Sequence, residues 1–427
     1  MSRRGAPCAA LRWLRCGAML SGAFLVAGPI QALPRFQELV DATAPGETLK
    51  PPPGRYAGPV VITRAIRIDG GGAVTIDAEG EGTVVRIEAD GVTLQRLRLT
   101  GSGDSHDRLD AGVQVRSNDN VIEDSQIDDC LFGIDLQQAD RNAVRRNQIA
   151  SKPFELGVKG DAIRLWYSRE NEVVDNVIRD SRDVVVWYSA DNLIARNSVT
   201  GGRYALHFMY SKFNRVEQNV YRGNMVGVFL MYSDGVVLRG NEIRDARGAT
   251  GMGIGFKETS SVLVEGNSIV NCARGIYLDI SPYEPDTLNT FVSNRIAYNG
   301  VGVMFHSDWH SNVFRDNDFV GNFTQVAVRG GGSASRNLWE RNRWDDYQGF
   351  DRDRDGFGDS PYETYAYADR FWVDRPLAAF FRGSPLFEAI DFLDRLAPFS
   401  SPTLIVRDES PRFSSADRRQ PAEASAP

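Results

Sequence analysis

The chain has 427 residues, of which 42% are hydrophobic and 25% are charged, and it contains 41 Gly and 4 Cys. These fractions exclude a disordered chain, a polytopic membrane protein and a disulfide scaffold. The formal net charge of −7 argues against general nucleic-acid binding, because no cationic surplus is available to displace counterions. By length alone, such a chain would form two or three globular domains.

The first 32 residues have the pattern of a secretory signal peptide. Four arginines precede an apolar stretch over residues 16–26, and Ala32 offers a cleavage site. The apolar stretch is shorter than the roughly 20 residues that a membrane anchor needs. We therefore expect residues 1–32 to be removed on export, leaving a chain that does not itself span the membrane. Cys130 and Cys272 would remain, and the sequence leaves open whether they pair.

A short motif recurs through the middle of the chain. Tyr-Ser ends a strand-like run at Ser168 and returns at Ser189, Ser211 and Ser233, in steps of 21 or 22 residues. A second column places one Asn in each copy: Asn147, Asn176, Asn197, Asn219, Asn241, Asn267, Asn294, Asn317 and Asn342. Apolar residues alternate with a period of two between these columns, as they do in strands. In stacked coils the Asn column would satisfy the backbone of the turns.

This repeat predicts an all-β chain that forms a right-handed parallel β-helix. Leucine-rich repeats need a different motif, and propeller blades need about 40 residues. We expect an N-terminal cap over residues 33–59 with a short helix near 34–42, and the β-helix over 60–345. A second helix opens at Pro385 within a C-terminal segment, 346–410, that caps the coils or contacts a partner. Residues 411–427 are rich in Ser, Ala and Pro and are predicted to be disordered.

Alternation along each strand predicts which side chains face outward. The predicted outward pairs are Arg164 and Trp166, Val185 and Trp187, His207 and Met209, Phe229 and Met231, Gly255 and Lys257, Tyr277 and Asp279, and Val303 and Phe305. Such a large apolar patch on a secreted protein usually marks a partner site. We interpret Trp166, Trp187 and Phe229 as partner-binding residues. His306 aligns instead with a column of tyrosines and is predicted to be a packed core residue.

The same face carries a candidate metal site. His207 and Met209 share a face of one strand, and Met231 lies over Met209 in the next coil. Imidazole and thioether ligands suit Cu(I) far better than Zn²⁺ or Mg²⁺. The structural alternative is that the methionines fill gaps in a protein interface without touching a metal.

A second candidate metal site is an acidic loop near the C-terminal end. Its carboxylates fall at the spacing of a Ca²⁺-binding loop, with Gly356 at the turn, and the Phe357 carbonyl would supply a further ligand. The predicted carboxylate ligands are Asp351, Asp353, Asp355 and Asp359. Tyr362 replaces the final Glu of an EF-hand, so we predict a structural calcium site that pins this end of the β-helix. The alternative is a solvated acidic loop.

An enzymatic function is the main competing interpretation. Many parallel β-helices cleave or epimerise acidic polysaccharides, which requires clustered acids or a strong base in one groove. Arg164 is the single strong base on the aromatic face, and the Asp128–Asp129 pair is isolated. We therefore expect a protein without enzymatic activity. The alternative is a periplasmic polysaccharide-binding or polysaccharide-cleaving protein.

Seven segments of the chain resemble the NosD family, the periplasmic β-helix proteins required to mature the copper sites of nitrous oxide reductase. They are residues 54–62, 165–168, 207–211, 256–258, 302–307, 355–362 and 384–399. The resemblance implies a periplasmic accessory protein that works with an ABC-type ATPase and permease. It also implies that copper arrives from a lipoprotein chaperone and passes, as transiently held Cu(I), to the reductase. The resemblance supplies no copper ligands, so His207, Met209 and Met231 rest on strand alternation and ligand chemistry.

Overall fold

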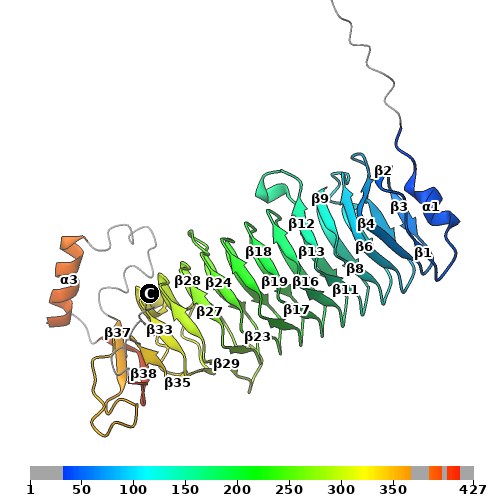
Figure 1. Cartoon of the computed structure of the whole chain (residues 1–427). Coiled ribbons are helices and arrows are strands. Elements are labelled where there is room, and N and C mark those ends of the chain that lie inside the picture. Colours follow the sequence, from blue (N-terminus) through cyan, green and yellow to red (C-terminus); the bar gives the residue numbers. More distant parts are fainter. Residues whose placement is uncertain (1–31, 367–383, 397–401, 414–427) are drawn as a thin grey trace, which may run out of the picture. The chain divides into compact units, whose positions relative to one another are not determined.

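The computed structural model describes residues 32–366, 384–396 and 402–413. The described elements lie in one compact unit that begins at Pro34. Successive coils stack in chain order, and their strands pair in parallel (Figure 1). The predicted all-β parallel β-helix is thus confirmed. The estimate of two or three globular domains is wrong, because a solenoid enlarges its core by adding coils instead of new domains.

Two parallel sheets form the coils, and each typical coil gives one strand to the first and two to the second. The twelve-stranded sheet comprises β3 (Val60–Ile62), β5 (Val85–Ile87), β7 (Ala111–Val115), β10 (Phe132–Gln137), β13 (Ile163–Trp166), β16 (Asp183–Trp187), β19 (Tyr204–Met209), β22 (Val226–Met231), β25 (Met252–Lys257), β28 (Arg274–Asp279), β31 (Val301–Phe305) and β34 (Thr324–Val328).

The 24-stranded sheet comprises β1 (Thr48–Leu49), β2 (Gly54–Ala57), β4 (Arg67–Asp77), β6 (Thr93–Thr100), β8 (Val121–Glu123), β9 (Gln126–Cys130), β11 (Ala143–Arg145), β12 (Gln148–Ser151), β14 (Glu172–Val174), β15 (Val177–Arg179), β17 (Leu193–Ala195), β18 (Ser198–Thr200), β20 (Arg215–Glu217), β21 (Val220–Arg222), β23 (Val237–Arg239), β24 (Glu242–Arg244), β26 (Leu263–Glu265), β27 (Ser268–Val270), β29 (Asn289–Val292), β30 (Arg295–Ala297), β32 (Asn312–Arg315), β33 (Asp318–Val320), β35 (Leu338–Glu340) and β36 (Arg343–Trp344). Two 3₁₀ turns, η1 (Leu156–Val158) and η2 (Arg329–Gly331), lie between strands.

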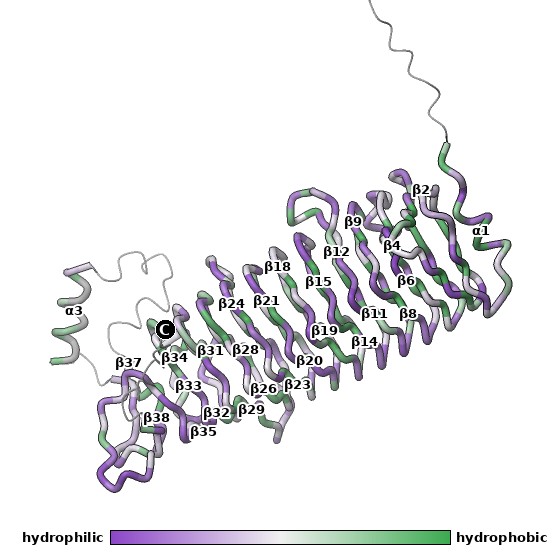
Figure 2. Tube along the Cα trace, viewed as in Figure 1, coloured by the Kyte–Doolittle hydropathy of each residue, from purple (hydrophilic) through white to green (hydrophobic). Residues whose placement is uncertain are grey.

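The core is a continuous column of inward-facing side chains. Hydrophobic and hydrophilic residues alternate along the coils (Figure 2), because successive strand residues point to opposite faces. Aliphatic residues dominate most coils, whereas the last coils stack aromatic rings. Phe314 lies between Phe291 and Trp339, at centroid distances of 4.5 and 4.1 Å. Cys130 and Cys272 are buried in this interior as free thiols.

Buried asparagines form hydrogen bonds that link the turns of successive coils. The Asn219 Oδ1 accepts the backbone N–H of Asn197 at 2.9 Å and its side-chain amide at 3.0 Å. The Asn219 amide in turn donates to the Ile194 carbonyl and to Asn241 Oδ1, both at 2.9 Å. This unit repeats from Asn147 to Asn342 and forms the asparagine ladder expected from the sequence column. Each buried turn therefore has its polar atoms satisfied by the next coil.

The N-terminal end carries the predicted short helix, α1 (Phe36–Ala42). Its Phe36 and Val40 are fully buried, and the Phe36 ring meets Tyr56 edge-on at 5.4 Å. The helix thereby adds two apolar side chains to the end of the core. Within the described ranges, no helix has both the length and the hydropathy to cross a bilayer.

Two antiparallel strands follow the last coil at the C-terminal end, β37 (Tyr362–Ala366) and β38 (Thr403–Asp408). The sequence patterns did not predict this pair. Asp408 Oδ2 accepts the backbone N–H and the side-chain amide of Asn342, both at 3.0 Å, and the indole N–H of Trp344 at 3.2 Å. A carboxylate thus takes the place of the next asparagine and terminates the ladder.

The second predicted helix is present as α3 (Pro385–Leu396). Its Leu386, Leu393 and Leu396 side chains are exposed, and a capping role for this helix stays a prediction. The predicted signal peptide lies outside the described residues, as does nearly all of the predicted disordered tail, 411–427.

Candidate functional site

Strand register aligns the outward side chains of the twelve-stranded sheet in two columns. One column runs Arg164, Val185, His207, Phe229, Gly255, Tyr277 and Met304. The other runs Trp166, Trp187, Met209, Met231, Lys257 and Asp279. The structure therefore places the predicted copper and partner residues side by side on β13, β16, β19 and β22.

The predicted outward pair on β31 is wrong. Val303 and Phe305 are fully buried, because they continue the inward positions of Ile276 and Leu278 on the preceding strand. Met304 pairs with Tyr277 instead and takes the outward position. The outward residues lie two and four positions before the closing Ser or Thr in the earlier copies, but Met304 lies three positions before Ser307, so alignment by this position gave the opposite face.

His306 is likewise not a packed core residue. Its ring is half-buried, and its Nδ1 lies 2.7 Å from the Tyr277 hydroxyl. The tyrosines that it was aligned with also lie outside the core. Tyr167 and Tyr210 are about half exposed, and the rings of Tyr167, Tyr188, Tyr210 and Tyr232 stack in series.

His207 and Met231 form the closest contact in the predicted copper site. The His207 Nε2 lies 3.3 Å from the Met231 sulfur. The two residues are diagonal neighbours, because Met231 pairs with Met209 and His207 pairs with Phe229. A nitrogen and a soft sulfur donor from adjacent coils thus converge at one point.

Aromatic rings enclose the imidazole. Tyr204 stacks on His207 at a centroid distance of 4.7 Å, while Trp187 meets it edge-on at 5.9 Å. Tyr204 and His207 are three residues apart, so strict alternation would place them on opposite faces. An irregularity in the pairing of β16 with β19 brings both rings to the same side. Sequence reasoning missed Tyr204 for this reason.

Burial keeps the imidazole neutral. Desolvation, opposed in part by Asp183 and aided by the smaller effect of the Arg203 guanidinium, lowers the pKa of His207 to about 4. Arg203 itself is paired with Asp183, which limits its effect on the ring. A neutral imidazole has a free lone pair and can bind a metal without first losing a proton.

Two buried polar atoms beside the site have no hydrogen-bond partner within the described part of the chain. They are Nδ1 of His207 and Nε1 of Trp187. Unsatisfied buried polar atoms are uncommon, and each one calls for a specific explanation. The polar atoms of the asparagine ladder, by contrast, are satisfied in every coil.

Two further methionine sulfurs are candidates for the site. Met209 is half-buried and pairs with both Trp187 and Met231 in register. The Met252 sulfur lies against the next outward position, since a Cβ atom at Gly255 would fall 2.6 Å from it and 2.3 Å from the Phe229 ring. The absence of a side chain at Gly255 therefore leaves room for Phe229 and Met252 beside Met231.

A cluster of buried charged residues lies in the coils that precede this site in the chain. Arg164 pairs with the fully buried Asp135 at 3.1 Å, and its guanidinium lies 4.7 Å above the Trp166 ring. Asp161 pairs with Arg182 at 2.8 Å, yet burial raises the pKa of Asp161 to about 6. Arg164 is therefore engaged in an ion pair and a ring contact and is not available as a general base.

The acidic loop brings three of its predicted ligands together. The carboxylate oxygens of Asp351, Asp353 and Asp355 lie within 4.8 Å of one another. Asp351 Oδ1 is buried without a partner in the described ranges, while its Oδ2 accepts the Gly356 N–H at 3.1 Å. Asp359 lies outside this group of three, and its Oδ2 accepts the Arg352 N–H at 2.7 Å. The Phe357 backbone bridges to Arg412.

The chain is similar to a known protein family and to two known proteins. The family described as "Periplasmic copper-binding protein (NosD)" matches residues 149–349. A protein named "Probable ABC transporter binding protein NosD" from Pseudomonas aeruginosa is 28% identical over 402 residues, which cover 86% of this chain and 87% of that protein. Its namesake from Stutzerimonas stutzeri is 25% identical over 423 residues, covering 90% of this chain and 91% of that protein.

Among solved structures, the A-module of the mannuronan C-5 epimerase AlgE6 from Azotobacter vinelandii is similar, with a TM-score of 0.54 and 16% identity. The match covers 71% of this chain and 93% of that module. The AlgE4 A-module from the same organism has a TM-score of 0.51, also at 16% identity, and covers 69% and 92% of the two chains. At this level of identity, the likeness shows a shared fold alone.

Proposed function

Since the chain is a NosD-like protein, we propose that it is a periplasmic accessory protein that binds Cu(I) transiently and relays it for the maturation of nitrous oxide reductase. The observation that carries the proposal is the 3.3 Å approach of His207 Nε2 to the Met231 sulfur inside an aromatic frame. Copper is the cargo of this site and not a resident cofactor.

The chemistry of the site favours a soft monovalent cation. The lowered pKa of His207 keeps the imidazole neutral at physiological pH, so one ring nitrogen has a free lone pair, and the tautomer that has it on Nε2 would offer it beside the Met231 sulfur. Thioether sulfur and neutral imidazole prefer Cu(I) over hard divalent ions. Met209, which pairs with Met231, is the third ligand in the proposal. Two or three neutral ligands would hold the ion loosely enough for transfer.

The half-buried Trp166, Trp187 and Phe229 form an apolar rim around these ligands. We assign this rim to partner docking, because contiguous apolar surface on a secreted protein is typical of interaction sites. The names of the relatives support association with an ABC transporter, and in our proposal its ATPase and permease are the partners. A copper-chaperone lipoprotein as donor and nitrous oxide reductase as acceptor complete the proposed relay.

Titration of Cu(I) into the exported protein tests the site. We expect the triple variant His207→Ala, Met209→Ala, Met231→Ala to bind Cu(I) about 100-fold more weakly than the wild type, because it loses all three soft ligands. Met225→Ala is the matched control, since Met225 is exposed, immediately precedes β22 and lies outside the proposed ligand set. Equal affinity in the triple variant and the wild type would contradict the proposed ligands. A wild-type protein that does not bind Cu(I) would contradict the relay.

We propose further that the acidic loop binds one structural Ca²⁺ through Asp351, Asp353, Asp355 and the Phe357 carbonyl, with Asp359 joining directly or through water. The gathered carboxylates and the unpartnered Asp351 Oδ1 support this assignment. The loop is fastened to the last coils by Arg412, which donates to Asp318 at 2.6 Å. Calcium would therefore stabilise the C-terminal end of the solenoid.

The proposed function is not enzymatic. The competing interpretation, binding or cleavage of an acidic polysaccharide, is tested by incubating the protein with alginate. Release of unsaturated oligosaccharides or a change in uronate composition would contradict our proposal.

A further inference from the structure

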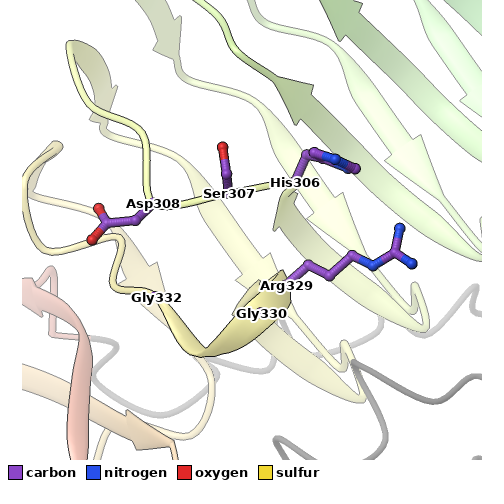
Figure 3. A pocket seen from close by; sticks show the side chains of 6 residues that line it. All are labelled: His306, Ser307, Asp308, Arg329, Gly330 and Gly332. Carbon is purple, nitrogen blue, oxygen red and sulfur yellow. The ribbon is translucent and has the colours of Figure 1, made fainter.

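A pocket lies several coils beyond the proposed copper site, next to the ends of β31 and β34. It has a volume of about 570 Å³ and is lined by His306, Ser307, Asp308, Arg329, Gly330 and Gly332. The side chains of His306 and Arg329 extend toward the same side, while Asp308 points away from them (Figure 3). The size suits a small organic ligand.

Two arginines, Arg329 in the pocket lining and Arg274 beside the neighbouring Tyr277 ring, lack a carboxylate partner among the described residues. Arg274 is half-buried on β28 and lies 5.9 Å from the Tyr277 ring. Arg329 follows β34 and is exposed, close enough to Arg274 for the two positive charges to destabilise each other. Burial is the main cause that lowers the pKa of Arg274, and the charge of Arg329 contributes less. Two neighbouring cations without a counter-ion are costly unless an anion joins them.

Arginines of the turn region show the contrasting arrangement. Arg141 pairs with Asp119, Arg196 with Asp175, and each bond joins one coil to the preceding coil. Arg341 pairs with Asp316 in the same way. Several arginines of the turns are thus neutralised by an acid of the adjacent coil, whereas Arg274 and Arg329 have no such acid among the described residues and lie close to one another.

His306 adds a third donor to the pocket. When the Tyr277 hydroxyl donates to His306 Nδ1, the proton of the ring is fixed on Nε2. Burial raises the pKa of Tyr277 above its ordinary value, so its hydroxyl stays protonated and keeps this role. The Nε2–H has no partner within the described ranges and is free to donate to a ligand.

Two acidic groups lie close to these donors. Asp308 lines the pocket, but it is held by Arg336 at 2.9 Å. Asp279 occupies the outward column one strand before His306 and raises the pKa of Tyr277. The two unpartnered arginines outweigh the single unpaired acid, so the pocket keeps a net positive charge.

We propose that Arg274, Arg329 and His306 form a binding site for a small organic oxyanion, a carboxylate or phosphate group carried on a compound of about monosaccharide size. Guanidinium groups bind such planar or tetrahedral oxyanions through paired N–H donors. The site is separate from the proposed copper ligands and does not rest on the copper relay.

Calorimetric titration of the exported protein tests the proposal with three probes of similar size: gluconate, a phosphorylated glucose and glucose. We expect one or both anionic probes to bind and glucose to show no binding. The double variant Arg274→Gln, Arg329→Gln should lose at least about tenfold in affinity for the anion. The relative affinity of gluconate and phosphorylated glucose identifies the preferred oxyanion.

Two further variants test which residues bind the anion. Arg179→Gln removes an exposed arginine of the other sheet and should leave anion affinity unchanged, while Tyr277→Phe should weaken binding by releasing the His306 ring. Circular dichroism establishes that each variant is folded, and the single variant Arg329→Gln, at an exposed position, serves if the double variant unfolds. Absence of binding to both anions, or equal affinity in wild type and arginine variants, would overturn the site. Unchanged Cu(I) affinity in the arginine variants would separate this result from the copper proposal.

Discussion

Asn219 and His207 lie in the same coil, and both are buried, yet their surroundings differ. Every polar atom of the Asn219 side chain is engaged, and the same residue type returns in coil after coil. His207 is not repeated on the neighbouring strands, its Nδ1 has no partner in the described ranges, and its Nε2 faces a sulfur. In a solenoid, a residue that recurs serves the stacking of coils, whereas a buried polar residue that occurs once is a candidate for function.

The largest effect on stability should come from the ladder. Asn219→Ala removes both an acceptor and a donor from three consecutive turns, which leaves buried N–H and C=O groups unpaired. We expect the free energy of unfolding to fall by about 4 kcal/mol. Chemical denaturation measures this change, and Cu(I) affinity of the folded variant should not alter. The neighbouring exposed substitution Gln218→Asn should change stability by less than about 0.5 kcal/mol, and an equal loss there would contradict the ladder argument.

The terminal carboxylate of the ladder provides the next comparison. Asp408→Ala leaves the Asn342 amide and the Trp344 indole N–H without their acceptor. We expect a loss of about 3 kcal/mol in the free energy of unfolding. Asp408→Asn retains one oxygen acceptor at the same place and should lose clearly less. A neutral Ala variant would show that β38 does not terminate the ladder.

The pH dependence of stability should reveal the buried carboxyl group of Asp161, which lies beside the candidate site. Burial raises the pKa of Asp161 to about 6, above the value of its unfolded state, so the folded protein prefers the protonated form. The stability from this group is present at low pH and is lost as the pH rises through 6. Between about pH 5 and about pH 7.5, the loss should be about 1.5 kcal/mol.

Denaturation of the wild type and of Asp161→Asn at both pH values isolates this contribution. The variant has no carboxyl group to ionise, so its own stability should change less over this interval. Parallel pH profiles for the two proteins would show that the Arg182 ion pair fully compensates for burial.

Removal of calcium should have the smallest effect, because the acidic loop is exposed and lies at one end. We expect chelation to lower the free energy of unfolding by about 1 kcal/mol, following the mass-action stabilisation by a bound ligand. Differential scanning calorimetry with and without chelator measures the shift. The variant Asp353→Asn should show a reduced response to chelation. A wild-type melting temperature that is indifferent to chelation would contradict the calcium site.

The fold could be predicted because its determinants are local and repeated. The motif repeats once per coil, with one Asn in each copy and apolar residues at every second position of the strands. These regularities follow from backbone hydrogen bonding between identical positions of stacked coils. The same alternation placed His207, Met209 and Met231 on one outward face. It failed at Val303 and Phe305, because the Ser that follows β31 lies one residue closer to the outward position than in the preceding copy.

The sequence by itself determined a parallel β-helix, its N-terminal helix and a soft His/Met face, since each depends on the spacing of nearby residues. Only the tertiary structure decided which atoms meet between coils: His207 with Met231, Tyr277 with His306, and Asp408 with the end of the ladder. These contacts depend on register between strands and on segments distant in sequence, here β38 and the last coil. No local pattern encodes them, because each residue acquires its role from a partner that the fold brings to it.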